Sequence, residues 1–135
     1  MASLKLRPKR GTDGLTELRV GTRADFDDGA RRIVHLEGLE IGILRHDGVF
    51  HAFENRCAHQ GGPVCEGSIL GKVEAVLGED RRVVGERFSE EELHLICPWH
   101  GWEYDLRTGE CAADRSVGLR RFEVIERGEE IYVRV

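Results

Sequence analysis

Proline, methionine and aromatic residues are scarce in this sequence, whereas glycine is abundant. The 135 residues include three prolines, one methionine and 7% aromatic residues, against 17 glycines. Few prolines among many glycines favour short strands joined by frequent turns, and argue against a disordered chain. No internal repeat or low-complexity tract divides the sequence, and its length fits one domain with its own hydrophobic core.

Long apolar runs are also missing. No run approaches the roughly 20 residues that span a bilayer, and the opening residues "MASLKLRPKRGTDG" lack the apolar stretch of a signal peptide. We therefore expect a cytoplasmic protein with no membrane partner.

Positive charge is not in excess either. The formal net charge is −5, which argues against a nucleic-acid partner because phosphates require a basic face.

Basic residues gather near the N-terminus, at Lys5, Arg7, Lys9 and Arg10. A short basic segment of this kind is typical of a solvated chain end rather than of a binding arm. We predict a flexible basic tail over residues 1–15, followed by one domain over residues 16–135.

From about Thr16 onward, short apolar segments alternate with turns. Leu39, Ile41 and Ile43 alternate onto one face of an expected strand, and Asp47-Gly48 is a strong two-residue hairpin turn. Strands this short and this frequent predict a mainly β fold, either an antiparallel sandwich or a barrel-like arrangement.

Residues 69–92 form a charged segment. Part of it reads as a hairpin that turns near Gly78-Glu79-Asp80. A solvated hairpin extension is the favoured interpretation, and an arm that contacts a partner or subunit is the alternative. Within it, Ser89 to Glu92 resembles a capping box and predicts at most one helical turn.

Two cysteine–histidine pairs stand out against the otherwise ordinary composition. Cys57 and His59 lie in "CAHQGG", and Cys97 and His100 lie in "CPWHG". Cysteines in a reducing cytosol point to metal or redox chemistry, and two glycine-bearing loops of this kind predict a Cys₂His₂ ligand set. Structural zinc sites favour two to four residues between paired ligands, whereas the first pair has one. The residues alone leave zinc and iron–sulfur open, and the preference for iron–sulfur comes mainly from the resemblance described next.

The two motifs together resemble those of a known family. C-x-H followed by C-P-x-H-G resembles the Rieske [2Fe–2S] motif, and "CPWHGWEYD" is similar to its form in ring-hydroxylating oxygenase systems. The resemblance implies one [2Fe–2S] cluster, with Cys57 and Cys97 on one iron and His59 and His100 on the other. It also implies a Rieske-type fold of three small antiparallel sheets, with the cluster held between two loops at one tip. Because these loops lie closer together in the small Rieske ferredoxins, the resemblance implies that the charged residues 69–92 are an insertion between them.

The resemblance further implies a one-electron carrier, the ferredoxin component that feeds an oxygenase or similar oxidoreductase. Its partners would be a reductase and a terminal oxygenase. We expect a non-catalytic electron-transfer protein and assign no catalytic residue, because too few residues follow the second motif for the catalytic domain of an oxygenase. A detached Rieske subunit within an oxygenase or reductase complex is the alternative, and a zinc-bound structural module is a weaker one.

Two imidazoles in place of two thiolates raise the potential of a [2Fe–2S] cluster to about −150 to +300 mV, against about −400 mV for plant-type clusters. High-potential members of the family carry a disulfide and a serine near the cluster. Here Gly62 and Trp99 stand at the disulfide positions and Trp102 at the serine position. We therefore predict a potential near the lower end of that range. Tyr104 is expected to donate a hydrogen bond to a ligand sulfur.

We expect the remaining cysteines and histidines to be structural residues that bind no metal. Cys65 and Cys111 are expected to be buried thiols, with a disulfide between them as the alternative. His46 and His51 flank the Asp47-Gly48 turn, yet no carboxylate stands at a fitting spacing for an iron site there. His94 is expected to be an ordinary strand residue.

Overall fold

The computed structural model describes residues 3–5, 9–10, 16–79 and 81–135. In this part of the chain the backbone forms strands, two short 3₁₀ turns and connecting loops, which confirms the mainly β fold. The strands are β1 (Ser3–Lys5), β2 (Lys9–Arg10), β3 (Thr16–Thr22), β4 (Arg31–Leu36), β5 (Leu39–His46), β6 (Val49–Glu54), β7 (Ser68–Leu77), β8 (Val83–Ile96), β9 (Glu103–Asp105), β10 (Arg121–Arg127) and β11 (Glu130–Arg134).

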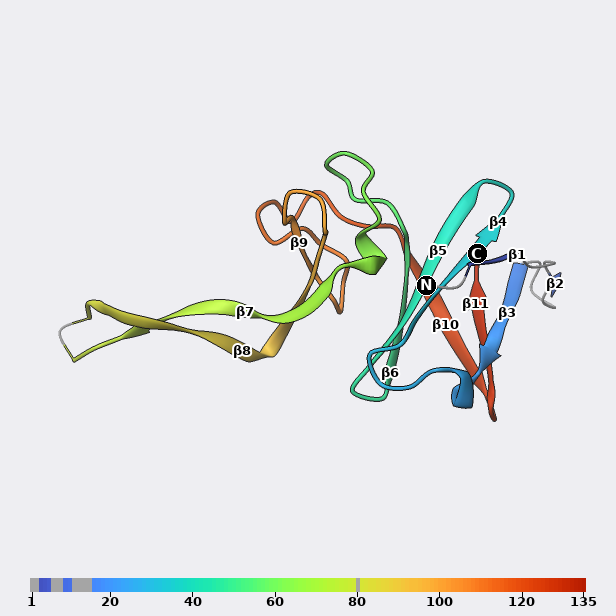
Figure 1. The fold of residues 1–135 in the computed structure, drawn as a ribbon, viewed down its shortest axis with the longest axis horizontal. Helices are drawn as coiled ribbons and strands as arrows, with labels where there is room; N and C mark the ends of the chain where they lie inside the picture. Colours follow the sequence, from blue (N-terminus) through green and yellow to red (C-terminus); the bar gives the residue numbers. More distant parts are fainter. Residues whose placement is uncertain (1–2, 6–8, 11–15, 80) are drawn as a thin grey trace.

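The strands form a larger and a smaller sheet. The larger has the order β1-β4-β5-β6-β10-β11-β3-β2, and the smaller has the order β7-β8-β9 (Figure 1). All pairs are antiparallel except β1 with β4. The resemblance implied three sheets. Two of them are joined here because β10 pairs with β6 through residues 121–122 and with β11 through residues 123–127.

The hairpin turns follow the sequence signals. Asp47 and Gly48 both have positive φ angles, 50° and 77°, as a type I′ turn requires. The β5–β6 hairpin that they close is registered from Ile41 opposite Glu54 to His46 opposite Val49. The predicted hairpin at this position is confirmed.

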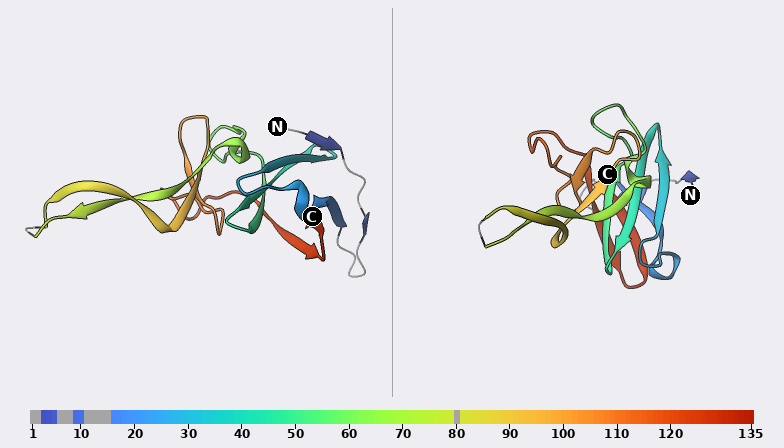
Figure 2. Two further views of the ribbon diagram at one scale, coloured as in Figure 1. Left: turned by 60° about the horizontal axis from the view of Figure 1, so that its bottom comes forward. Right: turned by 60° about the vertical axis from the view of Figure 1, so that its left-hand side comes forward.

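The hairpin expected in the charged segment is also confirmed. β7 and β8 pair over Ser68 to Leu77, and the turn is closed by the Gly78 N–H, which donates to the Arg82 carbonyl at 2.8 Å. The pair extends well beyond the rest of the molecule, as Figures 1 and 2 show. Whether residues 69–92 are an insertion relative to the small Rieske ferredoxins stays a prediction.

The predicted helical turn at Ser89 to Glu92 is wrong, because these residues lie within strand β8. Gly71 is opposite Leu93 and Val73 is opposite Phe88, so residues 89–92 face a single position of β7. The extra residues are accommodated as a bulge in an extended backbone. Pairing with β7 therefore overrides the local helix-start signal.

The N-terminal residues differ from the expected loose tail where they are described. Ser3–Lys5 pairs in parallel with Ile33 to His35, and Lys9–Arg10 pairs with Thr16 and Glu17. Arg7 lies outside the described residues. The boundary at residue 16 stays a prediction. No helix in the described ranges is long and apolar enough to cross a bilayer.

The buried residues fall into two clusters. The sheet core lies within the larger sheet and contains Leu18, Val20, Phe26, Val34, Ile41, Ile43, Phe50, Ala52, Phe122, Ile131 and Val133. The loop core lies between the two sheets, beneath the Cys/His loops, and contains Ile33, Leu44, Phe53, Cys57, Val64, Cys65, Leu95, Cys97, Tyr104, Leu106, Cys111 and Leu119. The two Cys/His loops therefore rest on a core of their own.

Candidate metal centre

Two loops of similar construction carry the Cys/His pairs. The first follows β6, and the Cys57 N–H donates to the Gly62 carbonyl at 2.8 Å. The second joins β8 to β9, and the Cys97 N–H donates to the Trp102 carbonyl at 2.8 Å. Each loop is thus closed from its cysteine to the residue five positions later, and each cysteine lies at the buried base of its loop.

Left-handed backbone conformations turn both loops. Gly61 and Gly101 have φ angles of 74° and 72°, which confirms the predicted use of glycine at these positions. His100 also has a positive φ, 64°, a conformation that costs a non-glycine residue free energy. Such local strain is typical of residues whose surroundings fix them for function.

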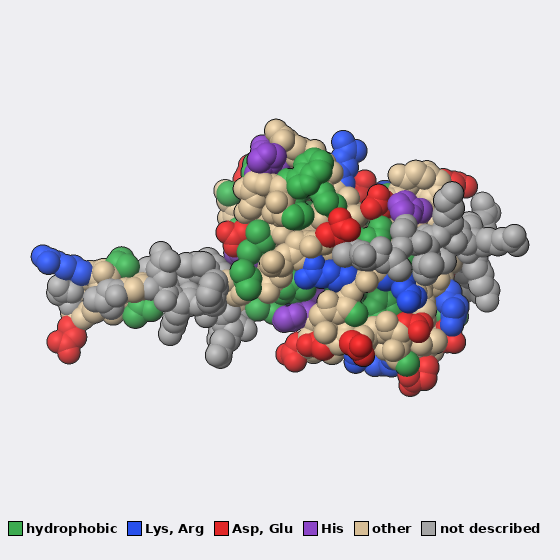
Figure 3. All heavy atoms as spheres, viewed as in Figure 1, with side chains coloured by type: hydrophobic (Ala, Val, Ile, Leu, Met, Phe, Trp, Pro, Cys, Tyr) green, Lys and Arg blue, Asp and Glu red, His purple; other side chains and the backbone are tan. Residues whose placement is uncertain are grey.

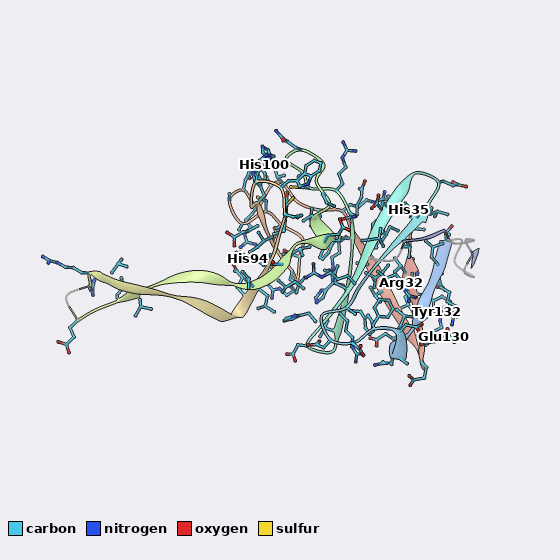
Figure 4. All side chains as sticks on the ribbon, viewed as in Figure 1. Arg32, His35, His94, His100, Glu130 and Tyr132 are labelled. Atoms are coloured by element: carbon cyan, nitrogen blue, oxygen red, sulfur yellow. The ribbon has the colours of Figure 1, made fainter. Side chains whose placement is uncertain are left out.

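The two loops bring like side chains together. The Cys57 and Cys97 thiols are buried within hydrogen-bonding reach of each other. The His59 and His100 rings are exposed, with centroids 5.1 Å apart, and Figure 4 shows His100 at the outer end of its loop. Two sulfur donors therefore lie at the base of the site and two nitrogen donors lie at its rim.

The two loops bring together side chains that can bind metal. Burial raises the pKa of the Cys97 thiol, and the neighbouring Cys57 thiol raises it further. A pair of thiolates there requires a compensating cation. Among residues 3–5, 9–10, 16–79 and 81–135, no three His, Cys, Asp or Glu side chains are grouped as for a single ion. Thiolates and imidazoles are ligands that suit zinc and iron alike, so this donor set fits an iron–sulfur cluster.

Tyr104 reaches from β9 to the first loop. Its hydroxyl lies 3.0 Å from Cys57 Sγ and accepts the Ala58 N–H at 3.0 Å. Because the oxygen already accepts from Ala58, its own proton is available to donate to the sulfur. Burial and the Cys57 thiol raise the pKa of Tyr104, which keeps the hydroxyl protonated. The expected contact between Tyr104 and a cysteine sulfur is confirmed.

The two tryptophans cover different parts of the site. Trp102 stacks on the His59 ring, with centroids 4.4 Å apart and planes 6° from parallel. Trp99 is half-exposed and packs over Gly62, where an added Cβ would lie 2.9 Å from two atoms of the indole ring. The two positions at which the resemblance implies a disulfide in high-potential members of the family are thus in contact, and an indole closes the gap between the loops here.

Sequence reasoning missed Asn55, which supports the first loop from below. Its side-chain amide donates to Glu40 at 2.8 Å, and its side-chain oxygen accepts the Cys65 N–H at 2.9 Å. Asn55 is buried just after β6 and two residues before Cys57. A polar residue at a strand end, immediately before a ligand motif, is the signal that could have identified it.

His94 is more than an ordinary strand residue. Its side chain is buried beneath the second loop, and its ring nitrogens lie 3.0 Å from a Glu103 oxygen and 2.6 Å from a Glu92 oxygen. Arg115 contacts Glu92 at 3.4 Å and Asp105 at 3.2 Å. This polar network ties β8 to β9, the two strands that flank the second loop.

The other cysteines, His46 and His51 are not part of the two loops, although Cys65 and Cys111 lie in the core beneath them. Cys65 and Cys111 are buried, as predicted, and all four cysteines are free thiols. Burial raises the pKa of Cys65 to about 12, so this thiol is unreactive. His46 and His51 line one cavity of about 400 Å³ with Asp105 among its walls. The described residues form no metal-ligand group there, and the absence of an iron site beside these histidines stays a prediction.

The family of the chain follows from comparison with known proteins. A model of the family described as the Rieske [2Fe-2S] domain matches residues 16–123. This match covers more than half of the 135 residues, so the chain belongs to the Rieske [2Fe–2S] domain family. One [2Fe–2S] cluster per chain is accordingly its cofactor. The resemblance seen in the two motifs is confirmed.

Several curated relatives are longer than this chain. A human Rieske domain-containing protein is 31% identical over 91 residues, which cover 67% of this chain and 47% of that protein. Human apoptosis-inducing factor 3 is 28% identical over 111 residues, which cover 82% of this chain and 15% of that protein. The chain thus spans less than half of either relative.

Other relatives are of similar length. The ferredoxin component of the alkene monooxygenase system of Xanthobacter autotrophicus is 22% identical over 126 residues, covering 93% of this chain and 87% of that protein. A chain of the complex of reduced oxygenase and oxidised ferredoxin in carbazole 1,9a-dioxygenase is 25% identical with a TM-score of 0.64. That match covers 87% of this chain and 91% of the other.

Proposed function

We propose that the protein is a one-electron carrier whose cluster is held by Cys57 and Cys97 on one iron and by His59 and His100 on the other. The observation that carries the proposal is the sorting of donors in the two loops. The thiols lie together at the buried base, and the imidazoles lie together at the exposed rim. When bound, a Rieske [2Fe–2S] cluster supplies reversible one-electron transfer.

The surrounding residues each have a part in this function. The Tyr104 hydroxyl donates to Cys57 Sγ and so stabilises negative charge on the sulfur. Trp102 orients the His59 ring by stacking on it, and Trp99 closes the gap between the loops above Cys97. Both indoles limit the access of water. The exposed edges of His59 and His100 are then the shortest route to a partner.

The proposed partners are a flavin-type reductase that donates the electron and a terminal oxygenase that accepts it. Support comes from two relatives of matching length, one a ferredoxin component of a monooxygenase system and one from a complex of oxygenase with ferredoxin. We place this relay in the cytoplasm, where partners of this kind work. A stable Rieske subunit within an oxygenase or reductase complex is the second candidate, favoured by the oxygenase-like "CPWHGW".

Metal analysis and electron relay test the proposal together. The purified chain should contain two irons and two sulfides, absorb in the visible and bleach with dithionite. Added to a flavin reductase and cytochrome c, it should accelerate cytochrome reduction in proportion to its concentration, whereas His100→Ala should not. A colourless protein with one zinc would refute the carrier. Recovery only in a fixed-stoichiometry complex that survives gel filtration would favour the second candidate.

A further inference from the structure

A polar hollow opens beside the first Cys/His loop. Its volume is about 570 Å³, and its lining runs from the end of β6 through the loop to the residue before β10. His59, a proposed ligand of the cluster, lines the hollow together with Arg56 and Arg120. A group that occupies the hollow therefore lies against the edge of the site from which the electron is proposed to leave.

The hollow is basic, although the chain as a whole is acidic. Among the described residues that line it, the guanidinium groups of Arg56 and Arg120 stand against one carboxylate, that of Glu54. The formal net charge of the chain is −5. Figure 3 shows a basic side chain at the end of the molecule where Figure 4 labels His100. The hollow thus has the sign that attracts an anionic group, and its recessed shape strengthens the local field.

The two arginines of the hollow are not neutralised within the described part of the chain. Both Arg56 and Arg120 are exposed, and among the described residues no carboxylate forms an ion pair with either of them. Arg19, Arg23 and Arg115, in contrast, each pair with a carboxylate of the same chain. The two guanidinium groups of the hollow are therefore available to a carboxylate from outside.

Contacts within the fold hold both arginines at the hollow. The Glu54 N–H donates to the Arg120 carbonyl at 2.9 Å, which joins the end of β6 to the start of β10. The Arg120 guanidinium lies over the Phe122 ring, 4.8 Å from its centroid. The Arg56 side chain lies along the first loop, where an added Cβ at Gly61 would be 3.6 Å from the Arg56 Nε. Because these contacts already place the side chains, binding costs them less conformational entropy.

We propose that the hollow is the docking site for acidic side chains of the electron-accepting partner, which bind to Arg56 and Arg120. This docking site presupposes the proposed function, in which the electron leaves by the exposed edge of His59. A guanidinium binds a carboxylate through two parallel N–H···O bonds, so the two arginines select both the charge and the orientation of the partner. Trp99 is 50% exposed at the same loops and adds an apolar contact.

Charge reversal at the hollow tests the docking site in the cluster-loaded full chain. The dithionite-reduced protein is mixed by stopped flow with plant plastocyanin, which docks through an acidic face, or with cytochrome c, which docks through a basic face. An ionic strength of about 0.1 M limits the reach of exposed charges to about 10 Å. Arg56→Glu and Arg120→Glu should each lower the rate constant for plastocyanin about fivefold and raise that for cytochrome c, because the two oxidants present opposite charges.

Arg121→Glu is the matched control. Arg121 is exposed on β10 and lines a different cavity, together with Phe50 and His51. Its reversal therefore changes the net charge equally without altering the hollow, and both rate constants should stay close to those of the native chain. Visible absorbance reports that each variant holds its cluster. A change in midpoint potential would move the rate constants for both oxidants in the same direction, so it is distinguished from a change in docking.

Two kinds of failure are separable in this experiment. Equal responses of the Arg120 and Arg121 variants, or a rate constant for plastocyanin that reversal at the hollow does not lower, would overturn the docking site and leave the carrier intact. A reduced native chain that passes no electron to either oxidant would refute the carrier, and the docking site with it.

Discussion

The two cores of the molecule are built from different residues. The sheet core consists of aliphatic and phenyl side chains, most of them on strands of the larger sheet. The loop core contains all four cysteines and Tyr104, and its upper surface consists of loops. The sheet core is thus held by register and packing alone, whereas the loop core contains Cys57 and Cys97, the two proposed thiolate ligands of the cluster. We therefore expect mutations in the sheet core to lower the free energy of unfolding, and mutations in the loop core to affect the cluster.

The largest effect is expected from removing a ligand sulfur. Cys57→Ser should abolish visible absorbance, because serine is a poor ligand for an iron–sulfur cluster, while the far-UV circular dichroism of the sheet persists. Cys65→Ser is the matched control, since it lies in the same core but points its thiol to the Phe53 carbonyl at 3.7 Å. Full cluster content in the Cys57 variant would contradict the assignment.

Shortening a buried side chain in the sheet core should instead affect the fold and leave the cluster unchanged. Ile131 is fully buried there, and Ile131→Ala should lower the free energy of unfolding by about 3 kcal/mol through lost burial and a cavity. Denaturant titration measures this loss. The midpoint potential should stay unchanged, and a shift in potential would show that the two cores are not separate.

An added methyl group between the loops should have an intermediate effect. In Gly62→Ala the new Cβ would lie 2.9 Å from the Trp99 ring and 3.1 Å from Cys97 Sγ. Overpacking there should cost about 2 kcal/mol and shorten the lifetime of the visible absorbance in air. Gly85→Ala, whose Cβ meets nothing within 4 Å, should keep the native lifetime. Identical lifetimes of the visible absorbance in the two variants would contradict the proposal that Trp99 closes the gap between the loops.

Loss of the Tyr104 hydroxyl should change the midpoint potential of the cluster without changing the stability of the fold. Tyr104→Phe removes the hydrogen bond to Cys57 Sγ. If that bond favours the reduced state by about 1.4 kcal/mol, its loss should lower the midpoint potential by about 60 mV. Protein-film voltammetry measures the shift. The free energy of unfolding should not change. An unaltered midpoint potential would show that the hydrogen bond from Tyr104 does not tune the cluster.

The smallest effect concerns acid stability far from the loops. Hydrogen bonds from Arg127 and then Arg134 lower the pKa of Glu17 from 4.5 to about 2. Because the folded pKa is depressed, the stabilisation is present above pH 4.5 and is lost as the pH falls towards 2. Glu17→Gln should therefore lower the unfolding temperature most near neutral pH, with the difference narrowing below pH 4.5. A constant difference across this range would contradict the ion pairs.

Local signals predicted much of this architecture. The Asp47-Gly48 turn, the hairpin within residues 69–92 and the glycines of both loops follow from chemistry that is readable at each position. Other features depend on residues far apart in the chain. The register with β7 makes Ser89 to Glu92 a bulged strand, and pairing with β4 orders Ser3–Lys5.

The candidate site likewise contains some residues that local motifs predict and some contacts that depend on tertiary packing. The motifs and their family resemblance predicted the Cys/His residues and Tyr104 at the sulfur. The buried partners of His94 and the bonds from Asn55 were not predicted, because each joins segments whose meeting is decided by tertiary packing.

The pairing of ligands is tested most directly by electron–nuclear double resonance on the dithionite-reduced protein labelled with ¹⁵N-histidine. The account predicts two distinct imidazole nitrogens coupled to the cluster, with one lost in His59→Cys and the other in His100→Cys. One coupled nitrogen in the native protein, or none, would contradict the assignment of His59 and His100 to one iron.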